Sequence, residues 1–130
     1  MIDHLGVTVS DLAKSKAFYT AALAPLEIKI LRDLPVVAAF GRGQKPELWV
    51  VGTKASYQSE AQYKAITPNH VCLRARNRDE VDAFYKAAMA AGGRDFGPPG
   101  IRAEYHPNYY GAFVLDPDGH NIEACFHGPA

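Results

Sequence analysis

A stretch of twenty residues occurs twice in this chain of 130 residues, and this repeat limits the possible folds more than any other feature. Shifting the sequence by 66 positions aligns His4–Leu23 with His70–Met89 without a gap, and six of the twenty positions are identical. The identical pairs are His4/His70, Ala17/Ala83, Phe18/Phe84, Tyr19/Tyr85, Ala21/Ala87 and Ala22/Ala88. Self-similarity at a fixed offset indicates that each copy is one structural unit, which buries its apolar face against its twin.

Each copy of the repeat predicts a strand followed by a helix. Apolar residues alternate with other residues at the start of both copies, which is the pattern of a strand with one covered face. The next segment begins at a helix-capping residue, Asp11 or Asn77, and continues with the spacing of an amphipathic helix. Pro25 ends the first helix and Gly92-Gly93 ends the second. The residues expected on the covered strand faces are Leu5, Val7, Val9, Val71, Leu73 and Ala75.

Three further strands are expected after each helix, so each half reads βαβββ. A Pro/Gly loop at 97–100 precedes the first of them in the second half, and the polar segment 52–69 connects the halves. Within that connection, 59–65 could form one or two helical turns. The expected strands are 26–31, 36–40 and 48–51, then 101–105, 109–115 and 121–126, the last two joined by a turn at Asp116–Gly119.

The resulting prediction is an α+β fold in a single domain, 1–130, with repeat modules at about 1–52 and 69–127. The eight strands would form a curled mixed sheet around a concave site, with the helices outside. The strand face opposite the covered one would line the concavity. That face carries His4, Thr8, His70, Cys72 and Arg74.

The composition excludes several classes of partner. Lys plus Arg equals Asp plus Glu at 14 each, so no excess positive charge favours nucleic acid or an acidic membrane surface. No apolar run approaches the roughly 20 residues that span a bilayer, and the N-terminus lacks the pattern of a signal peptide. The two cysteines do not form a C-x-x-C motif, so reduced thiols and a cytoplasmic location are expected.

Three residues of the concave face form a candidate metal site. His4 and His70 occupy the same position of the repeat, and a pseudo-twofold arrangement would bring them together. In the last strand Glu123 falls on the concave face, where a buried charge needs a partner or a metal ion. Two imidazoles and one carboxylate with vacant positions suit iron(II), and equally zinc, manganese or nickel.

These segments resemble the glyoxalase/bleomycin-resistance/extradiol-dioxygenase superfamily, also called vicinal oxygen chelate proteins. The resemblance covers the whole chain, through MIDHLGVTVSDLAKSKAFY, HVCLRA and the more specific YYGAFVLDPDGHNIEACF. It implies a paired βαβββ fold, frequent homodimers, and a divalent metal (Fe, Mn, Ni or Zn) held by the residues matching His4, His70 and Glu123. It also implies that the metal chelates adjacent oxygens of a small substrate, for isomerisation, addition or ring opening.

The first module departs from the glyoxalase I pattern. Those proteins add a fourth ligand, a carboxylate from the last strand of the first module, where this sequence reads PELWVV with Glu47 and Trp49 on one face. Counted from the matched Phe40 and Phe113, Glu123 lies ten residues on, Trp49 nine and Glu47 seven. Trp49 is therefore the nearer counterpart of Glu123, and a three-ligand site is expected.

Other residues are candidates for substrate contacts and proton transfer. Arg74 could hold a substrate carboxylate or pair with Glu123. The loop YHPNYYG supplies two candidate catalytic groups, His106 and Tyr109, and a candidate substrate contact, Tyr110. The remaining candidates for substrate binding are Trp49 and Glu47.

Four further residues are expected to have little part in the chemistry. Cys72 and Cys125 could supply thiolates, although small apolar packing is the simpler interpretation. His120 and His127 are expected to be solvated.

Two functions of different class remain open from the sequence. One is a metal-dependent enzyme, either a glyoxalase-like lyase or isomerase or a dioxygenase-like protein. The other is a metal-free protein that binds or sequesters a small molecule such as a drug, for which Trp49 would be a stacking wall. In both cases the partners expected are a small molecule and a second copy of the chain.

Overall fold

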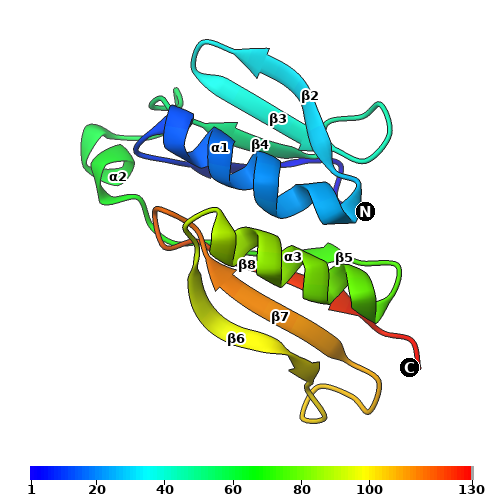
Figure 1. Ribbon diagram of the computed structural model, residues 1–130. Coiled ribbons are helices and arrows are strands. Elements are labelled where there is room, and N and C mark those ends of the chain that lie inside the picture. The colour runs from blue at the N-terminus through cyan, green and yellow to red at the C-terminus, as the bar shows by residue number, and fades with distance from the viewer. Residues whose placement is uncertain (130) are drawn as a thin grey trace.

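The computed structural model describes residues 1–129 as an α+β fold built from two βαβββ modules (Figure 1). The first module holds β1 (Leu5–Thr8), α1 (Leu12–Leu23), the 3-10 turn η1 (Ala24–Leu26), β2 (Lys29–Leu34), β3 (Val37–Gly41) and β4 (Leu48–Val51). The second holds β5 (His70–Arg74), α3 (Arg78–Ala90), β6 (Arg94–Ile101), β7 (Tyr110–Leu115) and β8 (Asn121–Phe126). A short helix, α2 (Glu60–Ala65), lies in the connection between them. The predicted fold class and paired modules are confirmed.

The eight strands form two four-stranded mixed sheets, neither of which closes. The strand orders are β1-β4-β3-β2 and β5-β8-β7-β6, so the two modules have the same topology. In each sheet the first and last strands of the module run parallel, and the other pairs are antiparallel. The parallel pairs, β1 with β4 and β5 with β8, place the candidate site residues on neighbouring strands.

One helix covers one face of each sheet. Helix α1 contacts β2, β3 and β4, helix α3 contacts β6, β7 and β8, and the two helices pack against each other (Figure 1). The repeated Phe18 and Phe84 are buried in this core. Full burial of such a ring stabilises a fold by roughly 1.5–3 kcal/mol. The helix starts are as predicted, since Asp11 accepts from the Lys14 N–H and Asn77 from the Glu80 N–H.

The predicted strand at 101–105 is wrong. Strand β6 runs from Arg94 to Ile101 and includes the Pro/Gly segment 97–100, which was expected to be a loop. The strand lies at the edge of its sheet, where a proline is tolerated because its missing N–H is not needed for pairing with a neighbouring strand. The register of its pairing with β7 shifts on both sides of Gly97. The segment predicted at 26–31 also starts late, at Lys29, because η1 takes up Ala24–Leu26.

The turn between β7 and β8 joins the second module to the first. His120 is fully buried, so its predicted exposure is wrong. Its Nδ1 accepts from the Asn69 N–H at 2.9 Å, and its Nε2 donates to the Thr8 carbonyl at 2.8 Å. The Tyr19 hydroxyl donates to Asp116 Oδ2 at 2.6 Å in the buried interior. These bonds, called the turn clamp below, hold β1 and α1 to the second module.

No helix in the described part of the chain, residues 1–129, is long and apolar enough to cross a membrane.

Candidate functional site

The uncovered face of β5 and β8 carries a buried carboxylate next to an imidazole. Glu123 is only 2% exposed, although the side chain of His70 beside it is half exposed. His70 Nε2 lies 3.2 Å from Glu123 Oε2. The Tyr109 hydroxyl donates to the other oxygen, Oε1, at 2.5 Å. His70, Glu123 and Tyr109 are therefore brought together, from β5, β8 and the loop before β7.

The hydrogen bonds of His70 determine which ring nitrogen is free. Its Nδ1 lies 3.2 Å from the Asn121 carbonyl oxygen, which can only accept, so Nδ1 carries the proton. In the neutral ring Nε2 then has a lone pair, and that lone pair faces the carboxylate of Glu123. Two acceptors at 3.2 Å favour a cation between or beside them, either a proton on the imidazole or a metal ion. The donor set thus fits the divalent metal that the resemblance implies.

Tyr109 is a proton donor in this arrangement. Burial, reinforced by the hydrogen bond to Glu123, raises the pKa of its phenol well above the ordinary value. The hydroxyl therefore stays protonated near neutral pH and holds one carboxylate oxygen in place.

His4 immediately precedes β1, the first strand of the other sheet of the chain. It is exposed, its Nδ1 is 2.7 Å from Asp3 Oδ1, and its ring meets the Trp49 ring edge-on at a centroid distance of 6.3 Å. Within residues 1–129 no hydrogen bond or ion pair joins His4 to His70 or Glu123. Among the described residues, no group of three ligand atoms within 4.8 Å of one another includes His4, so one chain brings two of the three predicted metal ligands together and leaves the third apart.

The strand registers place Trp49 where the second module has Glu123. Trp49 pairs with Gly6 in the first parallel ladder, and Glu123 pairs with Cys72 in the second. Gly6 and Cys72 are themselves matched positions of the repeat. Glu47 precedes β4 and is exposed. The indole Nε1 of Trp49 is buried without a hydrogen-bond partner in the described structure.

The remaining predicted residues, Arg74, His106 and Tyr110, have other neighbours. Arg74 is on the same face of β5 and lines a cavity of about 580 Å³ with Arg42, Phe126 and His127. His106 is half-buried and stacks on His127. The Tyr110 hydroxyl donates to Asp82 Oδ1 of α3 at 2.7 Å, and burial together with this bond raises the pKa of its phenol. Tyr110 is thus bound to α3 and not to Glu123.

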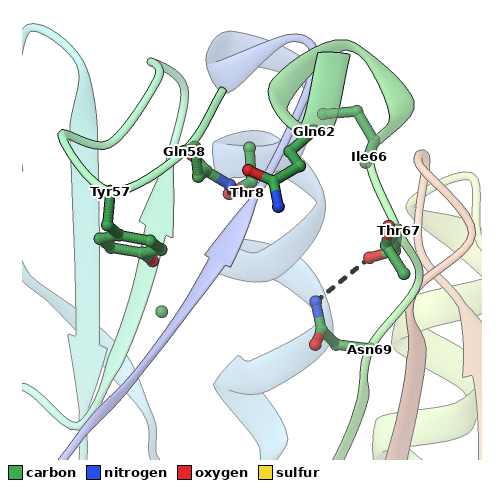
Figure 2. A pocket seen from close by; sticks show the side chains of 8 residues that line it. Thr8, Tyr57, Gln58, Gln62, Ile66, Thr67 and Asn69 are labelled. Carbon is green, nitrogen blue, oxygen red and sulfur yellow. Dashed lines mark hydrogen bonds between the residues drawn. The ribbon is translucent and has the colours of Figure 1, made fainter. Parts of the chain in front are cut away.

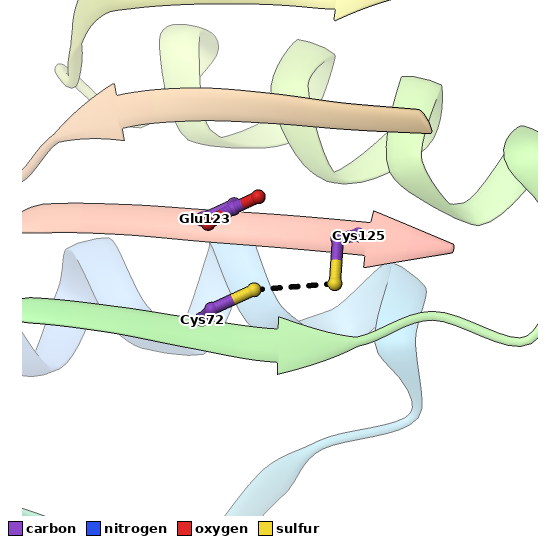
Figure 3. Close-up of side chains that lie close together, drawn as sticks. All are labelled: Cys72, Glu123 and Cys125. Atoms are coloured by element: carbon purple, nitrogen blue, oxygen red, sulfur yellow. Dashed lines mark hydrogen bonds between the residues drawn. The ribbon is translucent and has the colours of Figure 1, made fainter. Parts of the chain in front are cut away.

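Two cysteines adjoin the carboxylate. Cys72 Sγ donates to Cys125 Sγ at 3.2 Å, and the sulfur and carboxylate atoms of Cys72, Cys125 and Glu123 lie within 4.8 Å of one another (Figure 3). The hydrogen bond lowers the pKa of Cys125 to about 6 and raises that of Cys72. Strand alternation had placed both thiols on this face, but it could not predict that their sulfurs meet across two strands.

A second cavity lies on the uncovered face of β1, at the connection between the modules. It measures about 310 Å³, and its lining includes Thr8, Gln62 and Asn69 (Figure 2). Gln58 Nε2 donates to Thr8 Oγ1 at 3.2 Å, and the Ser59–Gln62 capping box starts α2. Sequence reasoning missed this cavity because the connection has no periodic pattern.

Comparisons with known proteins agree on the fold. The family model described as the Glyoxalase/Bleomycin resistance protein/Dioxygenase superfamily matches residues 1–124. A glyoxalase/bleomycin resistance protein from Albidiferax ferrireducens T118 is 28% identical with a TM-score of 0.73, over 98% of both chains. Lactoylglutathione lyase from Agrobacterium tumefaciens is 21% identical with a TM-score of 0.70, over 96% of this chain and 92% of that one. TioX from Micromonospora sp. ML1 is 16% identical with a TM-score of 0.71, over 98% and 99%. No curated protein matches the sequence.

Proposed function

Because the chain belongs to the glyoxalase/bleomycin resistance protein/dioxygenase superfamily, we propose that it is a divalent-metal-dependent enzyme acting on a small molecule. The observation that carries the proposal is the position of His70 Nε2, 3.2 Å from the buried carboxylate of Glu123, while its Nδ1 contacts the Asn121 carbonyl. An imidazole and a carboxylate in this arrangement form two thirds of the ligand set that the family uses. The reaction is either a glyoxalase-like lyase or isomerase step or a dioxygenase-like step.

The proposed ligands are His70 and Glu123 of one chain and His4 of a second copy. The bound Fe, Mn, Ni or Zn ion would supply Lewis acidity and a template for adjacent substrate oxygens. The residues of the chain itself would hold the ion and transfer protons. Glu123 supplies a fixed negative charge, the Tyr109 hydroxyl orients it, and Tyr109 and His106 are the candidate proton donors.

A homodimer is proposed because each sheet leaves one face uncovered. In a twofold dimer the uncovered face of the first module of one chain would meet that of the second module of the other. Trp49 and Glu47 would then enter the site beside His4, and Arg74 would lie at its margin. The proposed location is the cytoplasm, on the sequence argument that the chain has only two cysteines and no C-x-x-C motif.

Metal content measured on purified protein tests the proposal. We expect the wild type to take up Mn, Fe, Ni or Zn tightly, and His4→Ala, His70→Ala and Glu123→Gln each to weaken binding of Mn²⁺, the ion to which thiolates contribute least. Asp33→Asn is the matched control, because it removes an exposed carboxylate of β2 that pairs with Lys16 and contacts none of the proposed ligands. A wild type that binds none of these ions, or equal Mn²⁺ affinity in all four variants, would overturn the proposal.

Trp49 favours a second candidate, a metal-free binding protein. An aromatic ring at the position that corresponds to Glu123 provides a stacking surface in place of a charge. Quenching of the fluorescence of this single tryptophan by a panel of small aromatic molecules tests it. Affinity that persists after removal of metal by a chelator supports this candidate, and affinity that is lost with the metal supports the enzyme.

A further inference from the structure

The sulfur pair beside Glu123 has more polar neighbours than apolar packing requires. Two thiol sulfurs and a carboxylate converge on one patch of β5 and β8 (Figure 3), and the Tyr109 hydroxyl oxygen lies 4.0 Å from Cys72 Sγ. His127 approaches from the end of β8, with its Nε2 3.4 Å from Cys125 Sγ. Cysteines that merely fill space are surrounded by carbon atoms, and these are not.

We propose that Cys72, Cys125 and Glu123 form a second metal site, which takes a thiophilic divalent ion such as Zn²⁺. The site shares Glu123 with the proposed His4, His70 and Glu123 set but does not depend on it. Two thiolates and one carboxylate suit Zn²⁺ and its thiophilic relatives, whereas Mn²⁺ and other hard ions prefer oxygen ligands. Three protein ligands leave the fourth tetrahedral position open for water or an exogenous molecule.

The spacing of the two sulfurs suits a shared metal ion better than a disulfide. Cys125 pairs with Arg74, not with Cys72, so the cysteines lie on a diagonal two residues apart in register. At the usual strand spacing and rise, that diagonal separates the Cα atoms by about 8 Å. A disulfide needs at most about 7 Å. Two sulfurs that bind one tetrahedral Zn²⁺ lie about 3.8 Å apart, so the observed 3.2 Å requires only a small outward movement of the side chains.

A chain of hydrogen bonds with a defined direction ends on the sulfur of Cys125. The Asn108 N–H donates to His106 Nδ1 at 3.1 Å, so a neutral His106 carries its proton on Nε2. That proton is donated to His127 Nδ1 at 2.6 Å, which leaves the proton of His127 on Nε2, facing Cys125. An N–H donor stabilises a metal-bound thiolate and fixes its orientation. His127 is thus a positioning residue for Cys125 and not a ligand.

Titration of the reduced, metal-free chain with Co²⁺ tests the site, because sulfur bound to Co²⁺ gives an intense charge-transfer band in the near ultraviolet. We expect this band in the wild type, its loss in a Cys72→Ser, Cys125→Ser double variant, and its displacement by Zn²⁺ but not by Mn²⁺. The band should persist in His4→Ala and His70→Ala. Those two controls separate this site from the proposed catalytic metal, so that either proposal can fail without the other.

His127→Ala tests the positioning role by a spectroscopic signature. Loss of the N–H donor to sulfur should move the charge-transfer band to longer wavelength and weaken Co²⁺ binding by roughly 10- to 100-fold. An unchanged band position would contradict that role.

Three outcomes overturn the site as a whole. The first is a wild type without a sulfur band, and the second is a band that survives in the double variant. The third is rapid formation of a Cys72–Cys125 disulfide in air, detected as the loss of two hydrogens by mass spectrometry. The buried Cys125→Ser change could prevent folding, and the wild type then supplies the test. If Zn²⁺ protects the exposed Cys72 from an alkylating reagent and Mn²⁺ does not, the site is supported, and if neither ion protects it, the site is overturned.

Discussion

The carboxylate of Glu123 is almost completely removed from water, yet it lies on the uncovered face of its sheet. Tyr109 satisfies one of its oxygens, and the other faces the lone pair of His70. Burial of a charge is costly unless partners hold it, so every group around this carboxylate affects how well it binds a cation. Tyr109 can be changed without removing any proposed metal ligand, so its variant tests the surroundings of the carboxylate alone.

Tyr109→Phe is expected to lower metal affinity by roughly 10- to 100-fold, because the carboxylate loses the donor that orients it. The free energy of unfolding of the metal-free chain should fall by about 1–3 kcal/mol, since Oε1 is left buried without its partner. Isothermal titration with Mn²⁺ and urea unfolding measure the two effects. Tyr105→Phe, at an exposed tyrosine in edge contact with Tyr109, is the control, and equal losses in both variants would contradict the assignment.

At the scale of elements, the turn between β7 and β8 links the modules. Its two buried anchors are His120, bonded to the backbone at Thr8 and Asn69, and Asp116, bonded to Tyr19 of α1. The His120–Thr8 and Asp116–Tyr19 bonds connect residues 112 and 97 positions apart. The turn clamp therefore stabilises the arrangement of the modules and not only the turn itself.

His120→Ala should lower the free energy of unfolding by about 2–4 kcal/mol, because it removes two buried hydrogen bonds and leaves a cavity. Urea denaturation followed by circular dichroism measures the change. His4→Ala, at an exposed histidine, is the matched control and should cost less than about 0.5 kcal/mol. A loss as small as that of the control would show that the clamp does not hold the modules together.

Tyr19 gives the clamp a dependence on alkaline pH. Burial, aided by the nearby Asp116 carboxylate, raises the pKa of this phenol in the folded chain far above its unfolded value of about 10. A raised pKa in the folded chain stabilises the fold fully at pH values below the pKa of the unfolded chain. As the pH rises above that pKa and toward the folded one, the free energy of unfolding falls by about 1.4 kcal/mol per pH unit. Unfolding free energies between about pH 9 and 11 should therefore fall less steeply for Tyr19→Phe than for the wild type. Tyr57→Phe, at an exposed ring, should follow the wild-type curve.

The elements that the sequence predicted correctly are those with a strong local pattern. Both repeated helices begin at the expected caps, and the strands that carry His70 and Glu123 start where alternation placed them. Strand β6 was misplaced because its prolines read as a loop, and only its edge position in the sheet makes them acceptable. His120 was misjudged because its burial depends on β1, which is distant in sequence.

At the scale of the whole molecule, the repeat predicted the faces of each module but not the relation between the modules. Strand alternation correctly assigned Val7 and Val71 to the covered faces. The packing of α1 on α3 depends on side-chain fit and on the turn clamp, which leave no period in the sequence. For that reason the separation of His4 from His70 within one chain could not be read from the sequence alone.

A mixing experiment tests whether two chains share each site. His4→Ala and Glu123→Gln should each bind Mn²⁺ weakly when alone, because every site of either homodimer lacks one ligand. After unfolding and refolding together, half of the dimers combine both chains, and one of their two sites is intact, which restores about one quarter of the wild-type capacity. Light scattering should show a dimer at micromolar concentration. A monomer, or a mixture with no restored binding, would refute the shared site.

The two uncovered sheet faces have a consequence for how the protein must be assayed. If each chain carries only part of every catalytic centre, the number of working centres follows the law of mass action. Specific activity would then fall on dilution as assemblies dissociate, although every chain remains folded. A saturating ligand that contacts both chains would oppose this loss. The apparent KM for such a substrate would therefore depend on the concentration of the protein in the assay.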